Sequence, residues 1–472
     1  MIRNFLKFSF LLLTTIAFAQ TGHLMQGVGA VNMSMGGAAT AQPLDISGAM
    51  HWNPATLTSF DSTIIKLDIG FFKGTPTLYS SLPADMLGPG APAVSGATDS
   101  ELGISPMPAL AMAWGKKESK SKFGISMFGV SGFGVDFPQE TNNPMSPTFN
   151  PTVGSNPILY PQQAMGFGHM ESSYMLLQIG FTWAYQVDEH FSIGIQPTVN
   201  YSSLELSPSP LASPFDALGN PVGYPKTDNA TALGFGGQLG LFYDSLKGFK
   251  AGISYKTPQY FSAYEFENTF PDGSKGATDF TMNYPAIYSV GLGYSKGDFD
   301  LALDYRYVEY SNADGFEASG WELATSGPSA GFPTGAVNGF GWENMSIVSA
   351  GIQYKGIEKL PIRLGYTYSS NPISDELAMF SAPATAVIAN AFQGGLSFDI
   401  NKSFRIDGMF HYGMSDGKTS GKMLNPQMIS STNPLGEIPG SSVEYDMTTW
   451  MLQFGVSYKF GQKNKVEEIL PE

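Results

Sequence analysis

The 472-residue chain has only 14% charged residues, whereas soluble domains average about 25%, and its 55 glycines are about 12% of the chain against a usual ~7%. Its 25 basic and 40 acidic residues give a formal net charge of −15, which argues against nucleic acid as a partner because phosphate binding needs a basic surface. The absence of cysteine excludes disulfides, thiolate metal sites and cysteine nucleophiles.

The chain begins with the features of a secretory signal peptide. Arg3 and Lys7 form a positive region, residues 8–18 are an apolar run, and Ala17-Phe18-Ala19 fits the small-x-small cleavage pattern. The run is too short to span a bilayer as a helix, and no other uninterrupted apolar stretch approaches 20 residues. We expect residues 1–19 to be removed and the exported chain to begin at Gln20.

Residues 20–60 show neither strand alternation nor a long helical period. They are rich in glycine and small residues and end near a Trp-Asn-Pro-Ala motif at residues 52–55. About forty residues that precede a wide barrel must be accommodated, so we predict a hatch, or plug, that fills the lumen. The flexible methionine side chains of this segment suit contact with varied apolar ligands, although ordinary packing of the hatch explains them equally well. These candidate ligand contacts are Met25, Met33 and Met35.

Apolar and polar residues alternate through most of residues 61–460. In residues 298–308, for example, Phe299, Leu301 and Leu303 alternate with Asp300 and Ala302. A period of two predicts strands with one apolar and one polar face. Fourteen segments show it: 62–73, 108–117, 122–137, 172–187, 190–206, 231–244, 248–266, 279–295, 298–311, 345–355, 360–370, 391–400, 403–414 and 446–460.

The connections between these segments alternate between six short and seven long ones. Short turns on one side and long loops on the other, with an even strand number, are typical of an outer-membrane barrel. The fold class predicted is therefore all-β: a 14-stranded antiparallel transmembrane barrel with an N-terminal hatch. A soluble sandwich or propeller is the alternative, but it should carry more surface charge. Aromatic residues near strand ends suggest interfacial girdles: Trp183, Tyr185, Tyr201, Tyr310, Trp450 and Tyr458.

The third predicted strand contains an unusual group of glycines. Its alternation stops at Gly129, and Gly132-Phe133-Gly134 follows. Glycine within a strand suggests a bulge or a bend, with flexibility or close packing as the alternative. Pro197 and Pro285 also interrupt predicted strands, and each removes a ladder donor.

Nothing in the sequence indicates catalysis or a bound cofactor. The histidines, His23, His51, His169, His190 and His411, show no metal-binding spacing, and no Gly-x-Ser-x-Gly motif is present. We therefore predict no enzyme activity, no catalytic residues, no metal and no cofactor.

The hatch segment resembles that of the FadL-type outer-membrane transporters of long-chain fatty acids and hydrocarbons. The resemblance rests on Gly27-x-Gly29, on Met35-Gly36-Gly37 and on Asn53-Pro54-Ala55, and it continues through strand motifs to Tyr458-x-Phe460. It implies a plugged 14-stranded barrel with an inward kink in the third strand that opens a side exit. It further implies that the hatch motif comprises Gly29, Gly36, Gly37, Asn53, Pro54 and Ala55, with Asn53-Pro54-Ala55 as the hatch anchor. The kink and lateral exit would lie at Gly129, Gly132, Phe133 and Gly134.

The chain departs from the family's fatty-acid transporters where those carry basic residues that clamp the carboxylate. Rough matching places Glu205 and Glu317 at the corresponding stretches. Because like charges repel, these residues would disfavour a carboxylate and leave a neutral hydrophobic ligand as the alternative to a fatty acid. A polar tail, residues 461–472, also follows the family's usual terminal aromatic residue.

The function expected is passive uptake of hydrophobic small molecules across the cell outer membrane. The expected partners are the ligand, outer-membrane lipid and the barrel-assembly machinery during biogenesis, with the protein as a monomer. The alternative is a surface structural or adhesion barrel whose extracellular loops bind other molecules. The hatch separates the two functions, because an adhesin needs no plug.

Overall fold

The computed structural model describes residues 23–461 except 117, 217, 318–319 and 328–329, so the predicted signal peptide and residues 462–472 lie outside it. Fourteen strands form a closed antiparallel barrel, as the sequence predicted. These strands are β1 (Ile64–Leu82), β3 (Ser105–Trp114), β4 (Ser121–Phe137), β5 (Met170–Gln186), β6 (Phe191–Ser207), β8 (Ala230–Asp244), β9 (Phe249–Lys256), β13 (Ala286–Lys296), β14 (Phe299–Glu309), β17 (Met345–Tyr354), β18 (Ile362–Ser369), β19 (Ile388–Asp399), β20 (Phe404–Ser415) and β22 (Ser442–Lys459).

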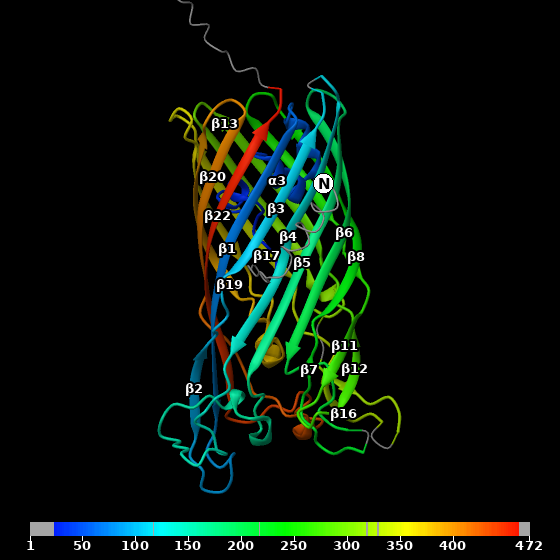
Figure 1. The fold of residues 1–472 in the computed structure, drawn as a ribbon, viewed down its shortest axis with the longest axis vertical. Coiled ribbons are helices and arrows are strands. Elements are labelled where there is room, and N and C mark those ends of the chain that lie inside the picture. The colour runs from blue at the N-terminus through cyan, green and yellow to red at the C-terminus, as the bar shows by residue number, and fades with distance from the viewer. Residues whose placement is uncertain (1–22, 117, 217, 318–319, 328–329, 462–472) are drawn as a thin grey trace, which may run out of the picture.

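The barrel closes where its first strand meets its last. β1 pairs with β22 from Ile64↔Lys459 to Ser81↔Ser442. The short connections lie at the end of the barrel where β22 finishes, and the long ones lie at the opposite end (Figure 1). Closure leaves no open outer edge, which is what a sheet in hydrocarbon requires.

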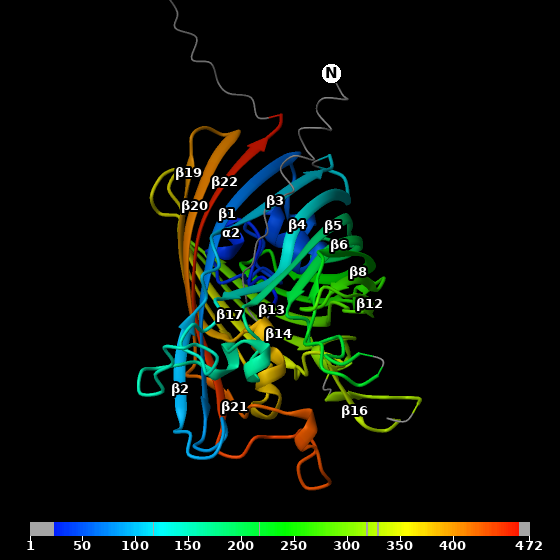
Figure 2. The ribbon, with the colours of Figure 1, turned by 60° about the horizontal axis from the view of Figure 1, so that its bottom comes forward.

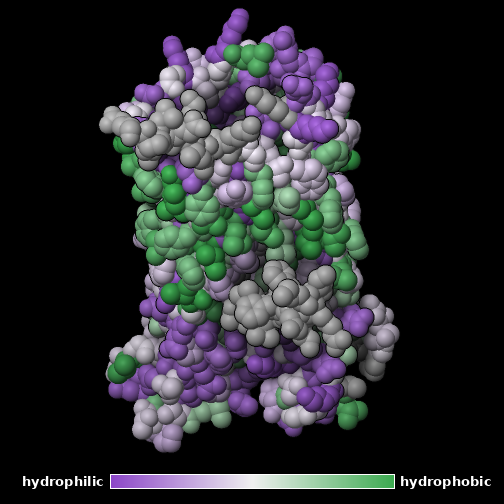
Figure 3. All heavy atoms as spheres, turned by 45° about the horizontal axis from the view of Figure 1, so that its top comes forward, coloured by the Kyte–Doolittle hydropathy of each residue, from purple (hydrophilic) through white to green (hydrophobic). Residues whose placement is uncertain are grey.

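The outer surface of the barrel is apolar at its middle. Along β14 exposed and buried residues alternate, and the exposed ones, among them Phe299, Leu301 and Leu303, are those that the alternation pattern placed on the apolar face. Figure 3 shows the resulting hydrophobic band between two hydrophilic ends. The arrangement inverts that of a soluble barrel and matches a lipid-facing surface.

Two predicted strands are divided in the structure. Residues 248–266 form β9, the short β10 (Tyr260–Phe261) and the start of β11 (Tyr264–Thr269), and Pro258 lies between β9 and β10. Residues 279–295 contribute the end of β12 (Lys275–Phe280) and then β13, with Pro285 between them. Proline cannot donate to a ladder, which explains both breaks. Pro197 lies within β6, where the β5–β6 ladder skips from Thr198 to Ile195.

The remaining strands extend the wall or fold the loops at the long-loop end (Figure 2). β2 (Val94–Asp99) pairs with β1, and β21 (Thr419–Gly421) pairs with β22. β11 (Tyr264–Thr269) joins β12 and β7 (Lys226–Thr227) in a separate sheet, while β15 (Trp321–Leu323) pairs with β16 (Pro333–Val337). Short 3-10 turns complete these loops: η2 (Pro157–Leu159), η3 (Gln162–Ala164), η4 (Tyr310–Asn312), η5 (Asp375–Ala384) and η6 (Pro426–Met428).

The hatch lies inside the barrel, near the end with the short turns (Figures 1 and 2). It contains α2 (Ala30–Met33), α3 (Ile46–Trp52) and the 3-10 turn η1 (Pro54–Ser59), and both helices are buried throughout. No helix among the described residues is long and apolar enough to cross a membrane.

Glycines of the wall allow the hatch backbone to approach closely. A Cβ atom built on Gly194 of β6 would lie 2.3 Å from the Ala55 amide nitrogen, and one on Gly252 of β9 would lie 2.0 Å from the Thr40 oxygen. Across the lumen, a Cβ on Gly365 of β18 would lie 2.1 Å from the Gly36 nitrogen. Any side chain at these positions would displace the hatch, which accounts for part of the chain's unusual glycine content.

The topology can be tested by labelling single cysteines, since the natural chain has none. Leu218→Cys, in the long connection after β6, should react with a membrane-impermeant maleimide on intact cells, because Leu218 is 87% exposed. Lys402→Cys, in a short turn, is the matched control and should react only after the outer membrane is permeabilised. Labelling of Lys402→Cys on intact cells would contradict this orientation.

Candidate functional site

Asn53 connects the hatch to the wall through its side chain. Its Nδ2 donates to the Thr40 oxygen at 2.7 Å and to the Leu241 oxygen of β8 at 3.0 Å, while its Oδ1 accepts from the Ala55 amide. One amide group thus joins two hatch segments and a barrel strand, and also caps η1. Pro54 stands at the first position of that turn, where its missing donor costs nothing.

The hatch loop after α2 is held by charged groups of β14. Gly36 and Gly37, with φ of +68° and +76°, turn the chain so that the amides of Ala39 and Thr40 reach Asp304 Oδ2 at 2.8 and 2.9 Å. Arg306 donates to both Asp304 and the Gly37 oxygen, at 2.7 Å in each case. Its guanidinium also lies 3.6 Å from the ring centroid of Trp52, a cation–π contact.

A second charged group holds the starts of both hatch helices. Lys66 of β1 contacts Asp45 at 2.7 Å, Asp407 at 3.1 Å and Asp68 at 3.7 Å. Asp45 caps α3 through the Gly48 amide, and Asp68 accepts from the Ala30 amide at the start of α2. Removing one member of such a buried network leaves an uncompensated charge. These contacts therefore hold α2 and α3, the body of the hatch, in place.

The barrel wall is incomplete between β3 and β4. Their ladder runs from Trp114↔Phe123 to Ala109↔Phe128 and stops there, although β3 stays paired with β1 and β4 stays paired with β5 to Phe137. We call this gap the seam, lined by residues 105–108 of β3 and 129–135 of β4. At its far end Glu101 donates to the Asp136 oxygen and closes the gap.

A bulge in β4 produces the separation. Gly129 pairs with Leu177 and Ser131 pairs with Leu176, so Val130 is the extra residue. From Val130 to Val135 every residue of β4 is buried on both faces of the strand. The bulge lies next to Gly129, and Gly132 and Gly134 fall in the segment beyond it that is buried on both faces.

Two prolines on β3 prevent the seam from closing, a signal that the sequence reasoning missed. Pro106 and Pro108 lie in the part of β3 that faces the seam, and they are two residues apart. Alternate residues direct their backbone groups to the same neighbour, so both missing donors belong to one edge. The β1 ladder continues past both prolines, which assigns the missing donors to the edge that β4 has left.

The start of the described chain occupies the free edge of β4. Leu24 forms an antiparallel bridge with Ser131, Met25 donates to the Val130 oxygen at 3.0 Å, and Gly132 donates to the His23 oxygen at 2.9 Å. The Ser131 hydroxyl adds a 2.8 Å bond to the His23 oxygen. We call residues 23–25 the gate segment, because they replace β3 as the partner of β4.

The side chain of His23 lies in a cage of rings. Its ring centroid is 4.5–5.8 Å from those of five aromatic residues, here called the aromatic box: Tyr174, Tyr284, Tyr310, Phe316 and Trp342. The Tyr310 hydroxyl lies 2.7 Å from His23 Nδ1. Burial lowers the pKa of the His23 imidazole to about 3, so the ring is neutral at ordinary pH. Tyr310 is therefore an internal residue and not part of a girdle, contrary to the sequence prediction.

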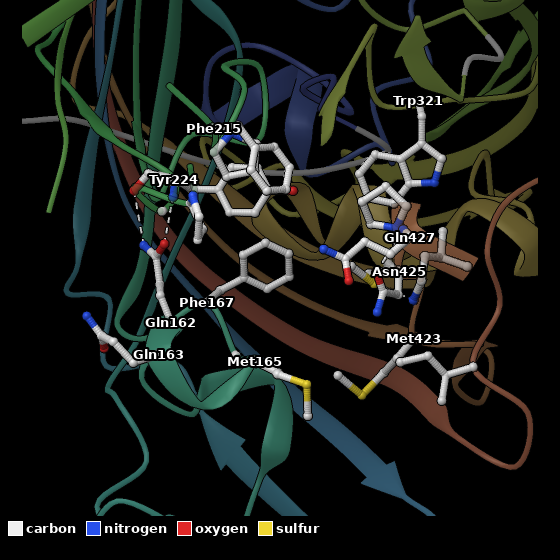
Figure 4. Close-up of a pocket in the computed structure, with 18 of the residues that line it drawn as sticks. Gln162, Gln163, Met165, Phe167, Phe215, Tyr224, Trp321, Met423, Asn425 and Gln427 are labelled. Atoms are coloured by element: carbon white, nitrogen blue, oxygen red, sulfur yellow. Dashed lines mark hydrogen bonds between the residues drawn. The ribbon is translucent and has the colours of Figure 1, made fainter. Parts of the chain in front are cut away.

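A cavity of about 500 Å³ opens among the long loops (Figure 4). Methionines from four loops line it, together with Phe167, Phe215 and Trp321; these methionines are Met86, Met165, Met379 and Met423. Gln162 bonds to the Tyr224 backbone on one wall, with distances of 3.0 and 2.6 Å. No Asp, Glu, Lys or Arg is among the described residues of its lining.

The candidate ligand contacts predicted from sequence lie elsewhere. Met25, Met33 and Met35 are buried in the packing of the hatch, and the cavity is lined by loop methionines instead. Glu205 pairs with Lys226 at 3.4 Å, and Glu317 is exposed. Neither carboxylate lines the loop cavity.

Two other ionisable residues of the lumen, Lys256 and His411, contact polar side chains of the wall. Lys256 is buried, donates to Gln178 at 3.2 Å and has no carboxylate within 4.0 Å among the described residues, but it lines neither the cavity nor the aromatic box. His411 contacts Gln393 and Thr449. Within the described part of the chain, no three His, Asp or Glu side chains gather in a way that could hold a metal ion.

Comparison with known proteins gives a family match and a set of similar folds. A family model described as outer membrane protein transport protein (OMPP1/FadL/TodX) matches residues 163–460. The toluene transporter TodX of P. putida is 15% identical with a TM-score of 0.61, and a FadL homologue of Pseudomonas aeruginosa is 12% identical with a TM-score of 0.66. Both alignments cover 93% of this chain and 100% of the other. A search of curated proteins found no match.

The contacts of Asn53 predict how firmly the hatch is held. Asn53→Ala removes two hydrogen bonds and a cap, so the hatch should lose roughly 1–3 kcal/mol of stability while the barrel stays folded. Hydrogen exchange of residues 30–59 measures the change. Ser47→Ala is the matched control, because the buried Ser47 hydroxyl has no hydrogen-bond partner among the described residues, and it should leave exchange unchanged. Equal exchange in the two variants would contradict the anchoring role.

Proposed function

This chain belongs to the OMPP1/FadL/TodX family of outer membrane transport proteins, and we propose that it admits neutral hydrophobic molecules by passive diffusion, with a sideways exit through the seam between β3 and β4. The closed barrel needs no second copy to complete its wall, so a monomer suffices. The observation that carries the proposal is the seam itself: a gap in a barrel wall, bordered by prolines and covered by a three-residue segment.

A chain of contacts between apolar residues links the loops to the seam and marks the route that we propose. The loop cavity contains Trp321 and Met379, and a smaller apolar cavity beside it adds Phe380. The next residue, Ser381, accepts a hydrogen bond from Trp342 of the aromatic box. On the other side of the box, Phe133 of β4 packs on Tyr174 at 5.0 Å. A hydrophobic molecule on this route stays out of water, and each buried square ångström contributes about 25 cal/mol.

The exit requires the gate segment to leave β4. Its three hydrogen bonds are worth roughly 0.5–1.5 kcal/mol each, whereas the network around Lys66 fixes the rest of the hatch. We therefore assign the opening movement to residues 23–25 and keep α2 and α3 in place. Adhesion is the weaker alternative, because a barrel that binds only through its loops needs neither a seam nor a hatch.

The gate can be locked by a disulfide. Leu24 and Ser131 form the non-hydrogen-bonded pair of their bridge, in which the Cβ atoms lie closest, and the chain has no other cysteine. Leu24→Cys combined with Ser131→Cys should abolish uptake of a hydrophobic solute into proteoliposomes when oxidised and restore it on reduction.

Each single cysteine variant serves as the control and should transport at one rate with or without reductant. Heat-modifiable migration on gels confirms that the barrel is folded in every case. Transport by the oxidised double variant at the rate of the reduced one would exclude a route that needs the gate segment to leave β4.

The uncharged lining predicts a preference among ligands of equal chain length. Methyl oleate should bind more tightly than oleate at pH 7, because a carboxylate in the loop cavity would lose hydration without gaining a cationic partner. Native mass spectrometry of protein purified in a ligand-free detergent measures both affinities. Tighter binding of oleate would contradict the proposed preference for neutral ligands.

A further inference from the structure

The aromatic box is occupied by a side chain of the protein itself, the imidazole of His23. Its five rings come from the strand β5, from the residues before β13 and from the connection between β14 and β17, and every one of them is buried. They surround one planar ring, the His23 imidazole, which stacks on Phe316 at 4.5 Å with an interplanar angle of 20°. Tyr284 meets the same imidazole edge-on at 5.7 Å.

His23 fits this box less well than a ligand could. Its Nδ1 contacts the Tyr310 hydroxyl, but Nε2 is buried with no hydrogen-bond partner among the described residues. An unpaired buried polar atom carries a desolvation cost. A six-membered carbon ring with a single polar atom would keep the stacking and the Tyr310 hydrogen bond and would remove the unpaired nitrogen.

We propose that the aromatic box is a binding site for neutral aromatic molecules that carry one hydrogen-bonding atom, phenols being the simplest class, and that His23 occupies it as a built-in competitor. The inference rests on the proposed transport function and names a substrate class for it. The hydroxyl of the phenol takes the place of Nδ1 beside Tyr310, and its ring takes the place of the imidazole on Phe316.

Occupation of the box also acts on the seam, because His23 uses its side chain and its backbone at once. The imidazole lies in the box, while the His23 oxygen accepts from Gly132 and from the Ser131 hydroxyl of β4. A ring that displaces the imidazole therefore pulls on the hydrogen bonds that cover the seam. The ligand class and the opening of the gate are linked through one residue.

The test compares three probes of similar size on the full-length protein in detergent. p-Cresol has a ring and a hydroxyl, toluene has only the ring, and 4-methylcyclohexanol has the hydroxyl without an aromatic ring. p-Cresol should bind most tightly. His23→Ala should raise its affinity at least tenfold by removing the competitor, and the exposed loop variant His169→Ala is the control that should leave it unchanged.

Tyr310→Phe tests the polar contact separately. It keeps the ring but removes the hydroxyl, so the preference for p-cresol over toluene should fall at least threefold while the affinity for toluene is kept. A cysteine introduced at Met25, which is 4% exposed, should react with maleimide faster when p-cresol is bound, because the gate segment is then released.

Equal p-cresol affinity in His23→Ala and the wild type would overturn the inference, as would tighter binding of 4-methylcyclohexanol than of p-cresol. Uptake of methyl oleate by the same wild-type preparation, reconstituted in liposomes, reports on the proposed function independently. Uptake without the His23 effect overturns the aromatic site alone, whereas p-cresol binding without any uptake overturns the transport function alone.

Discussion

The pairing of backbone groups in hydrocarbon is the constraint on which this structure depends. A bilayer offers no water to an unpaired N–H or C=O, so a sheet that crosses it must close on itself. The register of β1 with β22 achieves that closure. The same constraint makes the seam between β3 and β4 exceptional, since two strand edges part inside a wall that otherwise has none. Pro106 and Pro108 remove donors from one edge, and residues 23–25 pair with the other.

The contacts of the hatch differ along its length, and in the mechanism that we propose this difference separates a fixed part from a movable part. Buried charges hold the fixed part: Lys66 among three aspartates, and Asp304 with Arg306. Three uncharged hydrogen bonds to β4, worth roughly 0.5–1.5 kcal/mol each, hold the gate segment together with the packing of His23 in the aromatic box and the burial of Leu24 and Met25. Burial of an aromatic ring of about 150 Å² supplies roughly 4 kcal/mol. In the exchange that we propose, a ligand ring replaces the His23 imidazole in the aromatic box, so the polar contacts that must break are the hydrogen bonds to β4 and not the buried charges of the hatch.

The barrel could be predicted from the sequence, but most of the candidate site could not. Alternation along residues such as Phe299 and Leu301 is local, so the strands, their number and their lipid face could be predicted. The division of residues 248–266 at Pro258 required proline to be weighted more heavily than the apolar pattern. The aromatic box joins His23 to Tyr174 and Trp342 across most of the chain, and no local pattern reports such contacts. Glu205 and Glu317 are chosen by matching positions along the sequence. Such matching does not reveal that Glu205 pairs with Lys226 or that Glu317 is exposed.

In the mechanism that we propose, the gate segment closes the seam as a strand added to β4, which differs from a plug that swings on a hinge. The segment that covers the seam is bonded to the strand whose bend creates it, so opening needs no movement of the wall. Because β4 stays paired with β5 through Phe137, release of residues 23–25 exposes the backbone of only one short edge. A hydrophobic molecule in that place cannot satisfy the exposed groups, so the open state is costly once the ligand has gone. In the mechanism that we propose, this cost returns the gate segment to β4 after each passage, and the seam is covered again without any source of energy other than the gradient of the ligand.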